Sequence, residues 1–258
     1  MFNLYGKSIL ITGATGNLGR ELASGLAALG GEIHVNSRTE SECKELVDKI
    51  KRNGFKARVA CFDVTSEKDV LKYVDSIELL DVLVNNSYAG VGGNILSSSS
   101  EDYISSYQSS VVACANLIKQ LEHKFNLAVN RNGYASIINI ASMYGMVSPD
   151  QNIYGSTSTT NPPFYGAAKA ALIQFSKYAA CEFAKKNIRV NSISPGPFPS
   201  HSSQRDLPET IAKLVAKVPM GRIGIASEII GPVAFLASEA SSYVTGINIP
   251  VDGGWTAW

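Results

Sequence analysis

The sequence predicts an α/β fold, a doubly wound parallel sheet of about seven strands with helices on both faces. Three observations lead to this prediction. Short apolar runs alternate with segments of helical periodicity, the first apolar run leads directly into a glycine-rich turn, and 45% of the 258 residues are hydrophobic. A chain of this length and apolar content can bury one sizeable core, so we expect a single domain.

The segments predicted as strands and helices alternate along the chain. The predicted strands cover residues 7–12, 32–36, 57–62, 81–84, 135–140, 189–193 and 246–251. The predicted helices cover residues 20–29, 40–52, 66–77, 100 to about 124, 165–184, 208–217 and 227–236. The first strand is a short apolar run of the kind found in strands that are buried on both faces of a parallel sheet.

The glycine-rich turn lies between the first predicted strand and the first predicted helix and reads Gly13-Ala-Thr-Gly16-Asn-Leu-Gly19. Small residues let the backbone approach a pyrophosphate, and the N-terminus of the following helix supplies N–H groups and a positive dipole end. A tight turn without a ligand is the less favoured alternative. We expect a dinucleotide to contact the residues of this turn, namely Gly13, Thr15, Gly16, Asn17, Leu18 and Gly19.

The second predicted strand ends at Ser37-Arg38, where a carboxylate that binds the adenosine ribose hydroxyls is usually expected. A serine and a guanidinium suit a 2′-phosphate instead, because arginine offers a fork of donors to phosphate oxygens. The sequence therefore predicts NADP(H) as the cofactor, with NAD(H) less favoured; a solvated loop arginine is the alternative. Asp63 and Val64 follow the third strand and are placed to meet the adenine at the same edge of the sheet.

Tyr165 and Lys169 are four residues apart at the start of an apolar, helix-like run, so one helical turn separates them. A nearby cation favours the ionised form of an acid, and we expect Lys169 to lower the pKa of Tyr165 toward neutrality. Tyr165 is thereby a candidate acid/base group. Together with the glycine-rich turn and with Ser142, which ends the apolar run before it, the pair outlines a dehydrogenase. On a solvated helix face such a pair would have no function.

Charge and cysteine usage argue against several classes of protein. The 23 basic and 22 acidic residues give a formal net charge of +1 without a basic block, so no electrostatic footprint for nucleic acid or an anionic membrane is present. The four cysteines and three histidines show no metal-ligand spacing, and we expect no metal site. Because the sequence shows neither a signal-like start nor a long apolar run, we expect a cytoplasmic protein that binds a small molecule.

These motifs resemble the short-chain dehydrogenase/reductase family over residues 7–254, and most of all its ketoreductase-like members, such as 3-oxoacyl-ACP reductases and sugar dehydrogenases. The motifs that carry the resemblance are residues 12–19, Asp63, Asn85-Asn86, Ala89-Gly90, Ser142, Tyr165, Lys169, residues 188–191, Pro195-Gly196, Ser200 and residues 251–254. The family implies one Rossmann-type NAD(P)-binding domain over residues 1–258. It also implies a homotetramer or homodimer, often formed through the helices at residues 100–124 and 165–184.

The resemblance implies a role for each residue that matches a family motif. Tyr165 would deliver or remove the proton at the carbinol oxygen, Ser142 would polarise that oxygen, and Lys169 would bind the nicotinamide ribose and lower the pKa of the tyrosine. Asn86 would lie near the same ribose. The nicotinamide would be flanked by Pro195, Gly196, Phe198 and Ser200, for which an ordinary turn after a strand is the alternative. The implied activity is NADP-dependent interconversion of a carbonyl and a secondary alcohol.

The chain departs from the family pattern at three places. Gly16 lies three residues after Gly13, and Asn17 occupies the usual place of the second glycine. Ser87-Tyr88 widens the amide motif. Ser110 lies where the family has a helix asparagine that supports a proton relay to the lysine. Because a hydroxyl can donate and accept, we predict that Ser110 substitutes imperfectly for that asparagine; simple packing inside a long helix is the alternative.

We expect the substrate to contact two loops, at about residues 143–164 and 197–220. The first loop is longer than expected for the family and carries Tyr144 and Tyr154 with a run of Ser, Thr and Asn, which suits a sugar or an activated sugar. A solvated loop or a subunit contact is the alternative. Two other functions stay open: a catalytically weak NADP-binding sensor or assembly protein, and a nucleotide-sugar epimerase or dehydratase, which the Gly-x-x-Gly-x-x-Gly spacing favours.

Overall fold

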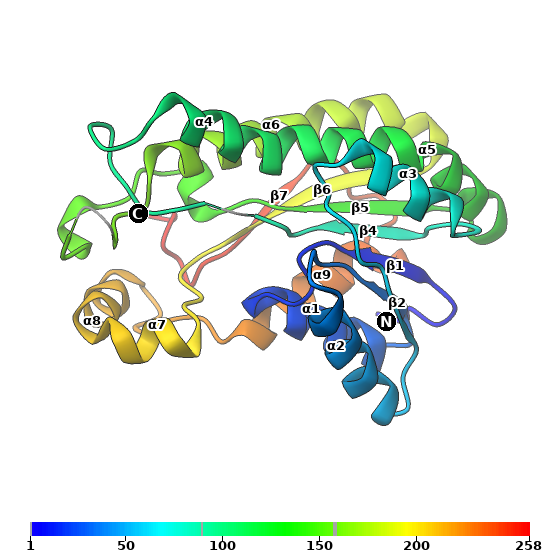
Figure 1. The fold of residues 1–258 in the computed structure, drawn as a ribbon, viewed down its shortest axis with the longest axis horizontal. Coiled ribbons are helices and arrows are strands. Elements are labelled where there is room, and N and C mark those ends of the chain that lie inside the picture. The colour runs from blue at the N-terminus through cyan, green and yellow to red at the C-terminus, as the bar shows by residue number, and fades with distance from the viewer. Residues whose placement is uncertain (1, 89, 157–158) are drawn as a thin grey trace.

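The computed structural model describes residues 2–88, 90–156 and 159–258. Its centre is one seven-stranded parallel sheet in the order β3-β2-β1-β4-β5-β6-β7 (Figure 1). The strands are β1 Ser8–Ile11, β2 Glu32–Val35, β3 Ala57–Val59, β4 Val82–Asn85, β5 Ala135–Ile140, β6 Ile188–Pro195 and β7 Asn248–Val251. Because the strand order reverses between β1 and β4, the sheet is doubly wound, and the predicted fold class is confirmed.

Helices cover both faces of the sheet (Figure 1). One face packs against α1 Asn17–Ala28, α2 Glu40–Arg52 and α9 Ile230–Ala237, and the other packs against α3 Glu67–Asp75, α5 Ala113–Asn132 and α6 Pro163–Phe183. The remaining α-helices of the described chain are α4 Ser100–Tyr107, α7 His201–Asp206 and α8 Pro208–Lys217. The last two follow β6 and lie next to each other below the sheet in Figure 1.

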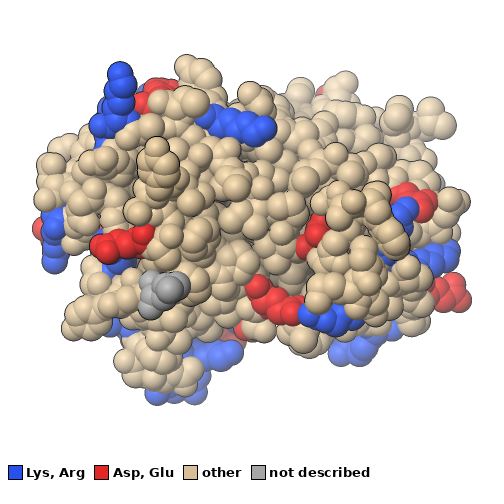
Figure 2. Space-filling view, turned by 180° about the vertical axis from the view of Figure 1, so that it is seen from behind, with Lys and Arg blue, Asp and Glu red and all other residues tan. Residues whose placement is uncertain are grey.

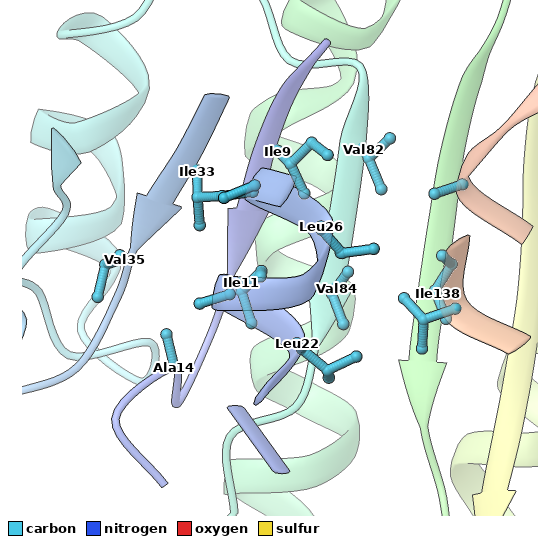
Figure 3. Packing of buried hydrophobic residues seen from close by; sticks show 14 of the residues in the cluster. Ile9, Ile11, Ala14, Leu22, Leu26, Ile33, Val35, Val82, Val84 and Ile138 are labelled. Atoms are coloured by element: carbon cyan, nitrogen blue, oxygen red, sulfur yellow. The ribbon is translucent and has the colours of Figure 1, made fainter. Parts of the chain in front are cut away.

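The helix α1 buries its apolar stripe on the sheet. Leu22 and Leu26 belong to one buried cluster with Ile9 and Ile11 of β1 and Val84 of β4 (Figure 3). All five side chains are fully buried, and each such burial stabilises the fold by about 1.5–3 kcal/mol. This packing places the start of α1 directly after the glycine-rich turn.

The helix predicted from residue 100 to about residue 124 is longer and is interrupted. α4 ends at Tyr107, a π-helical turn covers Gln108–Val112, and α5 continues to Asn132. At the start of α4, the Ser99 hydroxyl accepts a hydrogen bond from the Asp102 N–H while the Asp102 carboxylate accepts one from the Ser99 N–H. Hydrophobic periodicity does not reveal a single π turn, and such turns are frequent at functional sites. Ser110 lies in this one.

Other boundaries differ from the prediction by one to three residues, and one helix was not predicted. β3 ends at residue 59 instead of residue 62. α6 begins at Pro163 instead of residue 165, because Pro162 is extended (ψ 152°) and proline suits the first helical turn. Tyr165 therefore lies in the first turn of α6. The helix α7, six residues long, begins after Ser200 and is too short for a periodicity to be detected.

The surface shown in Figure 2 carries Lys and Arg side chains interspersed with Asp and Glu around its edge. This distribution gives the face a mixed potential in place of a basic stripe. Within residues 2–88, 90–156 and 159–258, no helix has both the length and the apolar character needed to cross a bilayer.

Candidate active site

A cavity of about 570 Å³ is lined by the segments that follow β1, β2, β3 and β4. The crevice outside the carboxyl ends of the strands is where doubly wound sheets bind their ligands. The residues of this wall that were predicted from the sequence to contact the cofactor are Gly13, Thr15, Gly16, Asn17, Leu18, Gly19, Ser37, Arg38, Asp63, Val64 and Asn86. The order of the strands thus brings to one site residues as far apart in the sequence as Gly13 and Asn86, 73 positions.

The glycine turn at the start of α1 forms a cradle for phosphate. Gly13 has a positive φ of 60°, and a Cβ there would lie 2.9 Å from the Cα of Ser87. A Cβ on Gly19 would collide with the carbonyl oxygen of Gly13. Gly16 is the N-cap of α1 and provides no side-chain hydrogen bond, so no capping side chain covers the first-turn N–H groups. A backbone that is free of side chains at a helix N-terminus fits the pyrophosphate of a dinucleotide.

The Asn86 amide stabilises this turn from the neighbouring strand. Its Nδ2 donates to the carbonyl oxygens of Thr12 (3.0 Å) and Gly13 (3.1 Å), and its backbone N–H donates to the Thr12 hydroxyl (2.9 Å). Asn86 therefore lines the cavity while its side chain is occupied with the turn. The resemblance had suggested only a contact near the ribose.

Arg38 and Asp63 line the part of the cavity where the adenosine was predicted to bind. Burial alone would raise the pKa of the Asp63 carboxyl. Two hydrogen bonds from Thr65 and the positive charge of Arg38 outweigh the effect of burial, so the pKa of Asp63 is lowered. One residue that sequence reasoning missed, Asn36, supports this part of the cavity. Asn36 donates from Nδ2 to the carbonyl oxygens of Ala60 (2.9 Å) and Phe62 (3.0 Å), which fixes the segment before Asp63. The sequence signal that could have identified Asn36 is an amide side chain directly after the second strand.

Ser142, Tyr165 and Lys169 meet where β5 ends and α6 begins. Ser142 follows β5, and its hydroxyl accepts a hydrogen bond from the Tyr144 N–H (3.1 Å). The same hydroxyl shares a side-chain hydrogen bond with Tyr165. Lys169 is one turn further along α6, and its Nζ lies 5.7 Å from the centroid of the Tyr165 ring. The structure thus brings together three of the four residues predicted to be catalytic; Ser110 is the fourth.

The electrostatics of this group differ from the sequence prediction. Burial raises the pKa of the Tyr165 phenol, and the hydrogen bond with Ser142 offsets part of the rise. Burial also lowers the pKa of Lys169 to about 8. The Lys169 ammonium donates to the carbonyl oxygen of Ile140 (2.8 Å). The predicted net lowering of the Tyr165 pKa toward neutrality is wrong, because desolvation dominates the pKa of both groups.

Tyr88, from the widened amide motif, is the aromatic neighbour of this group. Its ring meets the Tyr165 ring edge to face at 4.8 Å between centroids, and the Lys169 Nζ lies 5.3 Å from the Tyr88 centroid. Its hydroxyl is 3.4 Å from that of Ser106. Tyr88 lines the 570 Å³ cavity and also the pocket next to Tyr165. The widening was recognised in the sequence, but nothing local indicated where the ring would pack.

Ser110 is buried in the π-helical turn, and its hydroxyl finds no hydrogen-bond partner among the described residues. Cys114, four residues later, is also buried and interacts electrostatically with Lys169. A buried hydroxyl without a partner is costly. Ser110 thus lies one turn from Cys114, a neighbour of Lys169, and its part in a proton relay stays a prediction.

The residues predicted to flank the nicotinamide do not line the 570 Å³ cavity. Pro195 ends β6, and the Gly196 N–H donates to Val251 at 2.9 Å. Phe198 lines a separate pocket of about 120 Å³, but its carbonyl oxygen accepts from Nδ2 of Asn17 (3.0 Å) and so touches the glycine turn. Ser200 caps α7. The segment 195–200 therefore reaches the glycine turn only through the Phe198 carbonyl oxygen among these residues.

A pocket of about 310 Å³ opens beside Tyr165. Its described lining includes Tyr88, Tyr154, Thr159, Thr160, Asn161 and Tyr165. Behind it, the hydroxyls of Tyr144 and Tyr154 are 2.8 Å apart, and burial raises the pKa of both. Part of the predicted substrate loop thus reaches the site; residues 157 and 158 lie outside the described chain. In the loop predicted at 197–220, α8 packs near Tyr144 through Leu214.

Comparison with known proteins agrees with this geometry. A family model described as enoyl-(acyl carrier protein) reductase matches residues 13–256. A tropinone reductase homologue of Arabidopsis thaliana is 33% identical over 262 residues, which covers 99% of this chain and 91% of the relative.

Solved structures are similar over the whole chain. A gluconate 5-dehydrogenase from Burkholderia cenocepacia, in complex with NADP and tartrate, has a TM-score of 0.88 at 28% identity. The alignment covers 100% of this chain and 98% of that one. An NAD⁺-bound xylitol dehydrogenase has a TM-score of 0.84 at 30% identity, with coverage of 97% of this chain and 99% of that one. By its family model, its relatives and its fold, the chain belongs to the short-chain dehydrogenase/reductase family of NAD(P)-linked oxidoreductases.

Proposed function

We propose that this protein interconverts a carbonyl and a secondary alcohol on a small polar substrate with NADP(H), and that Tyr165 is its acid/base group. The observation that carries this proposal is the position of Tyr165, which lines a small pocket and lies next to Ser142 and Lys169. Its ring borders the 310 Å³ pocket, and the buried Lys169 and Ser142 lie beside it next to a cavity shaped for a dinucleotide. The bound cofactor supplies or accepts the hydride.

The side chains divide the proton chemistry among them. Because burial raises its pKa, Tyr165 keeps its proton at neutral pH and can donate it to a carbonyl oxygen during reduction. Ser142, already bonded with Tyr165, would donate to the same oxygen. Lys169 would bind the nicotinamide ribose, and its cationic form would stabilise the phenolate that is left after proton transfer.

NADP(H) is proposed as the preferred cofactor because Arg38 and Ser37 line the adenosine end of the cavity. Arg38→Ala should remove most of the preference. A charged hydrogen bond contributes about 1.5–3 kcal/mol, or roughly ten- to a hundredfold in the ratio of kcat/KM for NADPH and NADH. Equal efficiency with the two cofactors in the wild type would refute this part of the proposal.

A polyhydroxylated substrate fits the pocket beside Tyr165. Phenols, threonines and an amide offer hydrogen bonds to hydroxyl groups and rings to sugar faces. The similarity to a gluconate 5-dehydrogenase and a xylitol dehydrogenase supports a sugar or a sugar derivative as the substrate.

Turnover tests the proposal against its rivals. Purified protein is mixed with NADPH and a panel of keto sugars and diketones, and with NADP⁺ and the matching alcohols. Cofactor oxidation or reduction with at least one pair supports the oxidoreductase. Tight NADPH binding without turnover across the panel supports a sensor, which the Lys169 contact with the Ile140 carbonyl favours. Product formation with unchanged cofactor would identify an epimerase or dehydratase.

We also propose that residues 1–258 act as one NAD(P)-binding unit that forms a homotetramer or homodimer. Tyr103, Ile104 and Tyr107 of α4 are exposed and, with Phe164, line a groove between α4 and α6. An exposed apolar face of this kind suits a subunit contact. Light scattering of the purified protein measures the oligomer, and a monomer at micromolar concentration would contradict it.

A further inference from the structure

The 570 Å³ cavity is lined by a carboxylate, Glu42, that no sequence pattern indicated. The charged residues of its described wall are Arg38, Asp63 and Glu42. Glu42 belongs to the first turn of α2. Its side chain is exposed to solvent and lines the cavity. A 2′-phosphate entering this cavity therefore meets one guanidinium and two carboxylates.

Glu42 is held against the phosphate-binding turn. The Thr15 hydroxyl donates to Oε2 of Glu42 at 2.9 Å, across 27 residues of sequence. Arg20 donates to the Thr15 carbonyl oxygen at 2.8 Å, so the backbone of this part of the turn is fixed as well. The carboxylate is thus held beside the glycine turn and lines the same cavity as the segment Ser37–Thr39, where the adenosine ribose is expected.

The two cofactors differ at this position in charge and in hydrogen-bonding capacity. NADP(H) carries a 2′-phosphate, which Arg38 attracts and a carboxylate repels. NAD(H) carries a 2′-hydroxyl, which can donate to a carboxylate, and proteins that use NAD(H) commonly place an acidic residue there. Ser37 and Arg38, which follow β2, include no such residue, and Glu42 brings one from the following helix.

We propose that Glu42 is a second determinant of cofactor choice, which opposes Arg38 by repelling the 2′-phosphate of NADP(H) and accepting a hydrogen bond from the 2′-hydroxyl of NAD(H). The preference for NADP(H) is therefore weaker than Arg38 alone would give, and NAD(H) is bound as well. This inference rests on the proposed dinucleotide site and makes no use of the catalytic residues.

Binding calorimetry tests the inference without turnover. Adenosine 2′,5′-bisphosphate, adenosine 5′-monophosphate, NADPH and NADH are titrated into wild type, Glu42→Gln and Arg38→Ala. Glu42→Gln keeps the size of the side chain and the bond from Thr15 but removes the charge. It should tighten binding of the bisphosphate and NADPH about two- to fivefold, the upper part of the range for an exposed charge contact, and leave binding of the monophosphate and NADH equal or weaker. Arg38→Ala should shift the ratio of NADPH affinity to NADH affinity in the opposite direction.

The matched control is Glu40→Gln, in the same turn of α2. Glu40 forms an ion pair with Lys44 (2.8 Å) and does not line the cavity. Glu40→Gln removes the same charge from the same helix and should leave the ratio of NADPH affinity to NADH affinity unchanged. The effect of Glu42→Gln should also shrink as salt is raised from about 0.01 to 0.5 M, because exposed charges are screened.

The outcomes separate the two proposals. A ratio in Glu42→Gln that stays within twofold of wild type, or that moves no further than in Glu40→Gln, overturns the role of Glu42 while the dinucleotide site stands. Failure of the wild type to bind any of the four nucleotides overturns the site itself and this inference with it.

Discussion

The ring of Tyr88 meets the ring of Tyr165 edge to face, with centroids 4.8 Å apart and an interplanar angle of 73°. The same Tyr88 ring lies 5.3 Å from the ammonium of Lys169. One residue of the loop after β4 therefore contacts both members of the acid/base pair on α6. Edge-to-face contacts and cation–π contacts each contribute about 0.5–1.5 kcal/mol, so this residue can influence both positions.

Replacing Tyr88 should disturb catalysis through position. Tyr88→Leu removes the ring but keeps much of its apolar volume, and we expect kcat to fall about tenfold, the scale of one lost aromatic and one lost cation–π contact. Tyr88→Phe keeps both ring contacts and should retain nearly the full rate. Adenosine 2′,5′-bisphosphate affinity should stay unchanged in both. If Tyr88→Leu has the wild-type kcat, the ring is only a wall of the pocket.

Tyr165→Phe should abolish turnover with little effect on NADPH affinity. The change removes the proton donor and leaves the ring contact with Tyr88 and the phosphate contacts in place. Loss of a general acid typically costs about 10² to 10⁴ in rate. Steady-state rates and NADPH fluorescence titration measure the two effects, and a mutant within a few-fold of wild type would exclude Tyr165 as the acid/base group.

Ser110 should affect proton transfer without affecting cofactor binding. Its buried hydroxyl has no partner among the described residues, so Ser110→Ala costs no hydrogen bond within the chain and any loss of rate reports on the site. We expect Ser110→Ala to slow turnover across the pH profile and Ser110→Asn to keep or raise it, because an amide both donates and accepts. Identical pH profiles for Ser110→Ala and wild type would show that Ser110 only packs.

Lys169 should make stability depend on pH in a defined window. Its pKa is lowered from 10.5 to about 8 by burial. Between these values the unfolded chain binds more protons than the folded one, so the free energy of unfolding rises as pH rises through the window. The cost of the buried ammonium is present in full below pH 8 and amounts to at most about 3 kcal/mol.

Lys169→Met should therefore remove this pH dependence. Denaturant unfolding at pH 7 to 10 is measured for wild type, for Lys169→Met and for Lys177→Met, which removes a charge from an exposed position of the same helix. Relative to the mutant, the wild type should gain stability as the pH rises above 8. A difference between wild type and Lys169→Met that is constant over this range contradicts the lowered pKa.

Local features of the sequence were sufficient for the order of the elements and for most of the cofactor cavity. The alternation of apolar runs predicts the seven strands because burial on both faces leaves a direct imprint on composition. Gly13 to Gly19 predict a phosphate cradle because only small residues allow the backbone approach. Tyr165, Lys169 and Ser142 were found through their spacing and through the family resemblance.

Packing decided the features that no local pattern contains. Glu42 enters the cofactor cavity from a helix that appears in the sequence as an ordinary charged, amphipathic segment. Tyr88 reaches Tyr165 across 77 positions because β4 and β5 are neighbours in the sheet. The π-helical turn around Ser110 depends on how α4 and α5 pack and leaves no periodic signal.

The protonation of the site was also set by tertiary structure. Spacing along α6 correctly places Lys169 one turn from Tyr165, and from that distance alone a lowered tyrosine pKa follows. Both groups are instead desolvated by the elements packed around them, and the ammonium turns to the Ile140 carbonyl. The sequence by itself determines which groups are present and how far apart they lie on one helix. Only the tertiary structure determines how much water surrounds them, and for buried groups desolvation exceeds the effect of a neighbouring charge.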